Sequence, residues 1–345
     1  MAYTTIDNPA EYFNTVLYTG NGTDDTTISG VGFQSDLTWI KGRSNTAWHQ
    51  VTDSVRGAGN VISTNSTGAE SNFSSLKSWN SDGFVLSDNA NFNGNTVTFV
   101  SWNWKAGGGS GSSNEDGGIN TTSTSVNQTA GFSISTWTGT GSNATVGHGL
   151  NAVPKFITTK ARSHTYDWYT YHASIGNTKN IYLDKTNAAS SASANFHNNT
   201  DPTSSVWTAG GNIYNDTYTF VTYAFADVQG FSKVGSSYTG NGNANGPFVY
   251  TGFRPAFVML KKSSDTGNWL MYDTKREGYN VDNDALLANT SDAEETDDRI
   301  DILSNGFKLR GSQTANNASG ATYIYVAFAE APFVNSKGVP CNARK

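Results

Sequence analysis

One pattern occurs three times along the sequence, and this repetition limits the possible folds more than any other feature. Tyr18-Thr-Gly-Asn-Gly22 returns as Trp137-Thr-Gly-Thr-Gly141 and as Tyr238-Thr-Gly-Asn-Gly242. An apolar segment that ends in basic residues follows in each copy, at positions 37–43, 156–162 and 257–262. Each copy then has a tryptophan, at Trp48, Trp168 and Trp269, and closes on an aromatic segment, at 98–104, 219–225 and 322–328. The sequence therefore predicts three copies of one structural unit.

The composition indicates that this unit is made of β-strands. The 345 residues include 36 glycines and are only 14 % charged, whereas a typical soluble domain is about 25 % charged. Asn, Ser and Thr are frequent, and their side chains hydrogen-bond locally and compete with helix formation. Large and small residues alternate in the closing segments, which places the aromatic rings on one face of a strand. We therefore expect an all-β fold of three tandem antiparallel β-sandwich domains, jelly-roll-like in character and with little helix.

Shifts in composition place the limits of these domains. We expect β-sandwich repeats at 13–106, 131–228 and 231–334, and a C-terminal tail at 335–345. Residues 107–130 are rich in Gly and Ser and are expected to form a flexible linker. The first domain would then move relative to a more rigid pair formed by the second and third.

Charge and cysteine content exclude several classes of function. The net charge is −6 and no run of basic residues occurs, so nucleic-acid binding is not expected. No apolar stretch is long enough to insert into a membrane, and residues 1–19 lack the pattern of a secretion signal. The single cysteine, Cys341, cannot form an intrachain disulfide. Stability is therefore expected to come from packing and from assembly.

The polar residues give weak signals for catalysis or metal binding. None of the five histidines, His49, His148, His164, His172 and His197, has the spacing of a metal site, so we expect no metal and no cofactor. Carboxylates in the third copy could serve glycoside hydrolysis or, between 292 and 301, calcium binding; they are Asp273, Glu294, Asp297, Asp298 and Asp301. Asp53 and Asp273 each precede an arginine by three residues, Arg56 and Arg276, which favours local ion pairs that fix a loop. We therefore expect that the protein is not an enzyme.

The repeated aromatic residues allow two interpretations. Rings presented on loops could stack on sugar faces or contact a partner, and rings turned inward would fill the sandwich. The tryptophans fall at the same place in each unit, which favours packing within or between the domains. The candidates for glycan or partner contact are Trp48, Trp168, Tyr171, Trp269 and Tyr272.

Several segments resemble a family of virion structural proteins from tailed phages that infect aquatic bacteria. The matching segments are the start at 2–7, the runs at 100–108, 246–255 and 322–333, and the ending Cys341-Asn-Ala-Arg344. Proteins of this family are described as tail-fibre-like or as a domain of unknown function. The resemblance implies a component of the virion surface and brings no catalytic residues with it.

Together these observations predict a structural protein of a phage virion surface, in a tail fibre or tail appendage that contacts the host. The alternatives are a capsid decoration or head fibre protein and, in another class, a glycan-cleaving tail depolymerase. The expected partners are other virion proteins, a host-surface glycan or receptor, and further copies of the chain. A trimer is favoured for a fibre, and the alternative is a monomer that binds a partner protein through one domain.

Overall fold

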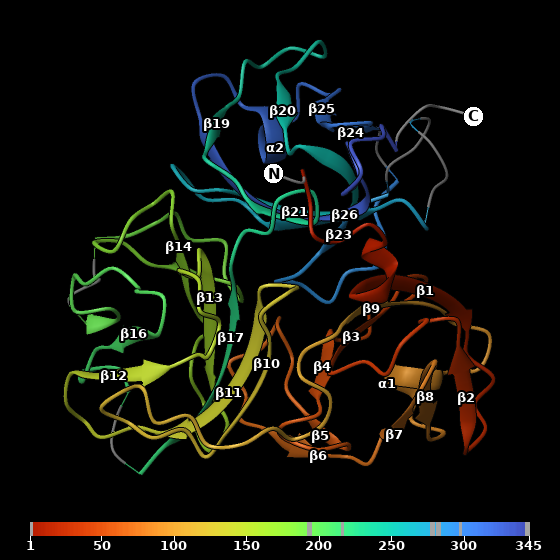
Figure 1. The fold of residues 1–345 in the computed structure, drawn as a ribbon. Helices are drawn as coiled ribbons and strands as arrows, with labels where there is room; N and C mark the ends of the chain where they lie inside the picture. Colours follow the sequence, from red (N-terminus) through yellow and green to blue (C-terminus); the bar gives the residue numbers. More distant parts are fainter. Residues whose placement is uncertain are drawn as a thin grey trace.

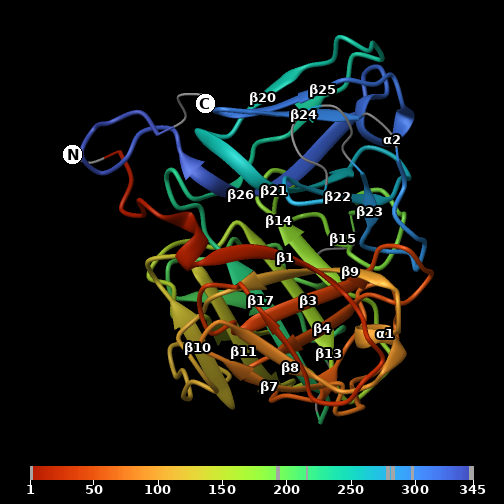
Figure 2. The same cartoon turned by 90° about the vertical axis from the view of Figure 1, so that its right-hand side faces the viewer.

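The computed structural model describes residues 3–191, 195–214, 217–276, 280, 284–296 and 299–341, and it is built almost entirely of β-strands (Figure 1). Strands hold 41 % of the residues and helices 4 %. The paired strands form several antiparallel sheets, so the predicted all-β sandwich class is confirmed. Figure 1 shows three lobes, coloured red to orange, yellow to green, and cyan to blue, around a common centre. In the turned view of Figure 2 the cyan-to-blue lobe again lies above the other two.

The first lobe contains an inner sheet with the strand order β1-β9-β3-β4 and an outer sheet with the order β2-β8-β7. A short strand pair, β5 and β6, and the helices η1 and α1 complete it. The bounds are η1 Pro9–Glu11, β1 Phe13–Thr19, β2 Thr26–Ser29, β3 Leu37–Gly42, β4 Gln50–Asp53, β5 Asn60–Val61, β6 Ser71–Asn72, β7 Leu76–Asn80, β8 Gly83–Leu86, α1 Ala90–Asn93 and β9 Thr98–Trp104.

The second lobe has an inner sheet with the order β10-β11-β17-β13-β14-β15 and an outer pair, β12 and β16. The bounds are β10 Ser123–Asn127, β11 Phe132–Thr138, β12 Ala144–Gly147, β13 Phe156–Ala161, β14 Tyr169–His172, β15 Ile181–Tyr182, β16 Val206–Ala209 and β17 Thr219–Phe225.

The third lobe has the inner order β18-β26-β21-β22-β23, with β19 also paired to β26, and the outer order β20-β25-β24. The bounds are β18 Ser232–Val234, β19 Tyr238–Thr239, β20 Phe248–Tyr250, β21 Phe253–Lys262, β22 Trp269–Asp273, β23 Leu286–Leu287, β24 Ile300–Leu303, β25 Gly306–Leu309, α2 Thr314–Asn317 and β26 Thr322–Pro332.

Strand order and register recur among the lobes. In each inner sheet the closing strand (β9, β17 or β26) lies between an early strand of the lobe (β1, β11 or β18) and the strand that carries the basic cluster (β3, β13 or β21). Equivalent residues also pair: Leu37 lies opposite Trp104, Phe156 opposite Phe225, and Phe257 opposite Phe328. The sequence repeat is therefore also a repeat of strand register. The exact limits predicted for the domains stay a prediction.

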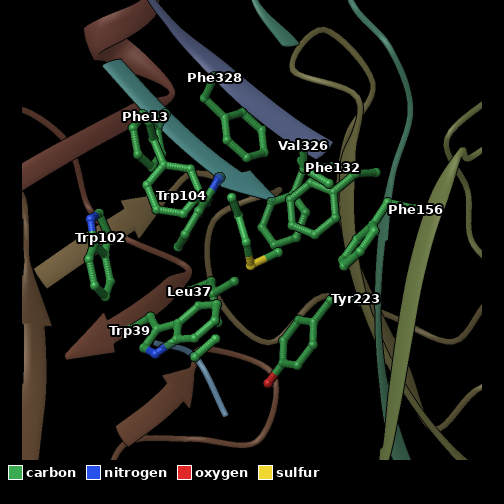
Figure 3. Packing of buried hydrophobic residues seen from close by; sticks show 14 of the residues in the cluster. Phe13, Leu37, Trp39, Trp102, Trp104, Phe132, Phe156, Tyr223, Val326 and Phe328 are labelled. Atoms are coloured by element: carbon green, nitrogen blue, oxygen red, sulfur yellow. The ribbon is translucent and has the colours of Figure 1, made fainter. Parts of the chain in front are cut away.

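The lobes share one core in addition to the three cores inside them. A separate apolar cluster lies within each lobe, and a fourth cluster takes residues from all three. The last aromatic residues of the closing strands, Trp104, Phe225 and Phe328, contact one another there, with ring centroids 5.6–6.4 Å apart. Figure 3 shows Trp104 and Phe328 in this shared core with rings from the second lobe beside them. Each inner sheet therefore buries one face within its own lobe and the other at the common centre.

The repeated Tyr-Thr-Gly-Asn-Gly motif holds the turn that precedes the closing strand. In the first lobe the Tyr18 hydroxyl donates to the Phe92 carbonyl, and the Gly22 N–H donates to the Asn93 carbonyl. A Cβ at Gly20 would lie 2.2 Å from the Gly94 carbonyl oxygen, so the close approach requires glycine. Tyr238, Gly242 and Gly240 make the same contacts in the third lobe, to Asn316, Asn317 and Ala318.

The predicted linker at 107–130 is attached to the lobes at several points. Asp36 accepts hydrogen bonds from the backbone N–H groups of Ala106, Gly108 and Gly109. Farther along the segment, β10 pairs with β11 over five residue pairs. Gly and Ser content alone predicts flexibility here, whereas the buried Asp36 carboxylate fixes the first part of the segment and β10 extends the second sheet.

Candidate functional site

The lobes form a closed ring through one repeated contact between a side chain and a backbone carbonyl. The indole N–H of Trp168 donates to the carbonyl of Ser63 in the first lobe, and that of Trp269 donates to Tyr182 in the second. His49 closes the ring, because its Nε2 lies 2.9 Å from the carbonyl oxygen of Leu287 in the third lobe.

The register identifies His49 as the residue equivalent to Trp168 and Trp269. Ile40 pairs with Gln50, Thr159 with Tyr169 and Leu260 with Leu270. His49, Trp168 and Trp269 each come one residue before Gln50, Tyr169 and Leu270. The sequence comparison placed Trp48 in this set and was wrong by one position. Trp48 corresponds instead to Asp167 and Asn268, and the repetition of tryptophan concealed a histidine that makes the same contact.

The five aromatic residues predicted as contact sites lie in different environments. Trp168, Tyr171, Trp269 and Tyr272 are 0–4 % exposed. Trp168 and Trp269 donate the hydrogen bonds that join neighbouring lobes. Tyr171 and Tyr272 belong to the separate cores of the second and third lobes. Trp48 is 52 % exposed. Among these five residues, only Trp48 therefore presents much of its ring to solvent.

The predicted ion pairs between Asp53 and Arg56 and between Asp273 and Arg276 are confirmed. Each pair belongs to a larger cluster across a lobe interface. Glu70 binds both Arg56 and Arg162 of the second lobe, at 3.0 and 2.8 Å, and the Tyr223 hydroxyl donates to Asp53. We call such a cluster an interface clamp.

The second interface clamp joins the third lobe to the first. Glu294 binds Arg276 and Arg43, at 2.8 and 2.7 Å, and the indole of Trp102 donates to Asp273. Burial opposes ionisation of Glu294, but hydrogen bonds and charge from Arg43 and Arg276 outweigh it and lower its pKa. The carboxylates considered for hydrolysis, Asp273 and Glu294, are therefore both neutralised within the clamp.

The interface between the second and third lobes has no interface clamp among the described residues, because less charged residues stand at the equivalent positions. His172, Ile175 and Ala189 take the positions of the Asp, Arg and Glu, and Val326 takes the position of Trp102. The equivalence of Ala189 follows from its backbone, because its N–H donates to Ser263 as those of Glu70 and Glu294 donate to Arg162 and Arg43. All charged members of the clamp have thus changed together.

A buried lysine lies at the same position in every lobe. Lys41, Lys160 and Lys261 are each 0 % exposed, and their ammonium groups donate to backbone carbonyls. Burial lowers the pKa of Lys41 and Lys160 to about 8 and that of Lys261 to about 7. The basic clusters in the sequence therefore mark positions at which a lysine stem fills an interface.

The five histidines all have structural contacts within the chain. His49 accepts from the indole of Trp39, and burial lowers its pKa well below the usual range. No group of three or more His, Cys, Asp or Glu side chains that could hold a metal ion occurs among the described residues. Asp297 and Asp298 lie outside the described residues. Over the same part of the chain, no helix is long and apolar enough to cross a membrane.

The exposed rings of β20 were not found by the sequence analysis. Phe248 is 45 % and Tyr250 56 % exposed, while Val249 between them is buried. Val249 belongs to the core of the third lobe, so its two neighbours on the strand project from the outer side of the sheet. The signal available in the sequence was the alternation of Phe, Val and Tyr, which is also typical of a buried strand.

The other two lobes show that the fold does not need rings at these positions. The pairing of β20 with β25 corresponds to that of β2 with β8 and of β12 with β16. Phe248 corresponds to Thr27 and Thr145 in this register. Tyr250 corresponds to Ser29 and Gly147. Small residues complete the sheet twice, so Phe248 and Tyr250 are the residues most clearly in excess of what folding requires.

Polar side chains lie beside these rings on the same outer sheet. Lys308 on β25 lies opposite Phe248 on β20. Asp301 on β24 lies opposite Lys308 on its other side. Arg310 forms an ion pair with Asp301 at 3.1 Å, and its side chain is 48 % exposed. We call Phe248, Tyr250, Lys308, Asp301 and Arg310 the β20 face.

A family model described as a domain of unknown function, DUF7483, matches residues 8–332. The chain belongs to this family. The DUF7483 match begins just before η1 and ends at the last residue of β26, so it covers all three lobes of the ring. No curated protein and no solved structure matches the chain.

Proposed function

We propose that this DUF7483 protein is a structural component of a tailed-phage virion surface, located in a tail appendage that contacts the host. The β20 face carries the proposal, because it presents two aromatic rings to solvent at positions where the other lobes have small residues. Exposed aromatic residues flanked by charged groups are typical of contact surfaces. The resemblance of several segments to virion structural proteins supports the same assignment.

The construction of the ring suits a protein that works outside the cell. The single cysteine is free, so no intrachain disulfide supports the fold. The lobes are joined instead by two interface clamps, three carbonyl contacts and one shared core. Such a body can present the β20 face in a fixed orientation.

The alternative of a glycan-cleaving depolymerase has weaker support. Hydrolysis requires one carboxyl group that can give up a proton beside a second that stays ionised. Asp273 and Glu294 share Arg276 and are buried between lobes, and Asp53 and Glu70 share Arg56 in an equivalent cluster. A duplicated clamp at lobe interfaces favours a structural role for these acids.

Imaging of labelled virions tests the proposed location. An antibody fragment raised against the purified protein is bound to intact phage particles and located by electron microscopy. The proposal predicts label at the tail. Label spread over the head would show that the protein is a capsid decoration or head fibre protein, and absence from purified virions would contradict both assignments.

A further inference from the structure

We propose that the β20 face binds a neutral glycan by stacking sugar rings on Phe248 and Tyr250. The inference deepens the proposed function and rests on it for the source of the glycan, which would be the host surface. The proposed ligand unit is a pyranose ring, which has an apolar face of C–H groups and a rim of hydroxyl groups.

The geometry of the rings supports stacking. Phe248 and Tyr250 are two positions apart on one strand, so their side chains lie on the same face of the sheet. The tip of the Phe248 ring covers Gly306, since a Cβ at that glycine would lie 3.0 Å from the ring. The ring therefore lies close against the sheet and, at 45 % exposure, leaves apolar area for a ligand.

The groups beside the rings match the rim of a sugar. Arg310 and Lys308 are hydrogen-bond donors, and Asp301 accepts, so both functions of a hydroxyl group can be met. The Asp301 carboxylate pairs with Arg310, and the Lys308 ammonium donates to the Gly246 carbonyl, so each cation already has a partner within the chain. This arrangement favours a neutral glycan over a charged one.

The size of the face favours a glycan over a protein. β20 has only three residues, and the charged side chains of Lys308 and Asp301 follow Phe248 across the outer sheet. A stable protein interface buries about 800 Å² on each partner and has a core depleted of charge. Two rings with ionic groups beside one of them fit one or two sugar units better than a protein partner.

Binding of defined oligosaccharides to the full chain tests the inference. The immobilised protein is exposed to soluble oligomers of glucose, mannose, galactose and N-acetylglucosamine, and to oligogalacturonate as an acidic probe. The double variant Phe248→Thr with Tyr250→Ser introduces the residues of the first lobe, which the same sheet accepts there. Phe73→Ser is the matched control, because it removes a 59 % exposed ring from another part of the molecule.

We expect saturable binding of at least one neutral oligomer, weakened roughly tenfold or more in the double variant and unchanged in Phe73→Ser. Arg310→Ala, which keeps both rings, should weaken the same binding. The inference is wrong if no neutral oligomer binds, if only oligogalacturonate binds, or if the double variant binds as well as the parent chain. Thermal melting confirms that each variant is folded.

Binding of the same variants to treated host cells shows whether the receptor is a glycan or a protein. Binding of the purified protein to host cells that depends on Phe248 and Tyr250 should disappear after periodate oxidation of the cells. The same binding should survive protease treatment of the cells. The opposite pattern would assign the β20 face to a protein and overturn the inference. Neither result depends on where the protein lies in the virion, so failure here is distinct from failure of the proposed function.

Discussion

Asp184 has a carboxylate at a position where the other two lobes have an asparagine amide. Its Oδ1 accepts the backbone N–H of Trp168 at 3.1 Å, and Asn65 and Asn289 accept the N–H groups of His49 and Trp269 in the other lobes. Burial and, secondly, the charge of Asp167 raise the pKa of Asp184 to about 6. An amide would make the same contact without the cost of a buried charge.

We therefore predict that Asp184→Asn stabilises the protein. A folded-state pKa above the unfolded value means that the aspartate costs stability as the pH rises through about 6. At pH 7.5 the variant should gain about 1–2 kcal/mol in the free energy of unfolding, and below pH 4 the gain should vanish. Urea titration at both pH values measures it. The reverse exchange, Asn65→Asp, should destabilise the chain at pH 7.5, and a stabilised Asn65→Asp variant would contradict the explanation.

The three buried lysines predict an unusual pH dependence. Burial lowers their pKa values to between about 7 and 8, below the value of 10.5 for an exposed lysine. The unfolded chain therefore binds more protons than the folded chain over this range, and stability should rise with pH from about 7 to about 10. Melting temperatures from pH 6 to pH 10 test this, with Lys261→Met expected to reduce the rise. A flat or falling curve for the parent chain would show that these lysines stay protonated when buried.

At the scale of elements, the interface clamps differ from ordinary surface ion pairs. Arg276 is shared by Asp273 and Glu294 and is buried with them. Removing its charge leaves the buried Asp273 carboxylate without an ion-pair partner and leaves Glu294 with Arg43 alone.

Arg276→Met should therefore destabilise the protein by about 3–5 kcal/mol. Lys77→Met is the control, because Lys77 pairs with Asp24 and Asp25 at an exposed site, and its loss should change the free energy of unfolding far less than the loss of Arg276. Guanidinium titrations of both variants give the comparison. Equal small losses would mean that the clamp contributes no more than a surface pair.

The clamps also show what the sequence could and could not reveal. The spacing of three residues between Asp53 and Arg56 predicted a local pair correctly, because such a pair closes a turn within one segment. Glu70 and Arg162 come from different lobes, and nothing in local spacing brings them together. The alternation of large and small residues predicted the strands and their class. It could not show which face of β20 was exposed, because Phe, Val and Tyr suit either a buried or an exposed strand.

Equivalence between repeats was also hard to assign from residue identity alone. The pattern of tryptophans aligned Trp48 with Trp168 and Trp269, but strand pairing aligns His49 with them. A neutral imidazole and an indole both offer a ring N–H at the edge of a flat side chain. The hydrogen bond to the next lobe was therefore kept while the residue type changed.

At the scale of the whole molecule, the three lobes occupy the positions that three subunits would hold in a cyclic trimer. Trp168 and Trp269 each donate a hydrogen bond to a backbone carbonyl of the preceding lobe. The contact of His49 with the third lobe closes the ring. A ring closed in this way uses its repeated interfaces within one chain. Self-association as a trimer stays a prediction, and it would have to use outer faces of the lobes.

The lobes form one body around a shared core instead of three independent sandwiches. Trp104, Phe225 and Phe328 each lose their ring partners from the other lobes if one lobe unfolds. Differential scanning calorimetry of the full chain tests whether the lobes unfold together. We predict one transition whose calorimetric and van't Hoff enthalpies agree. Two or three separable transitions, each with the enthalpy of a single lobe, would contradict it.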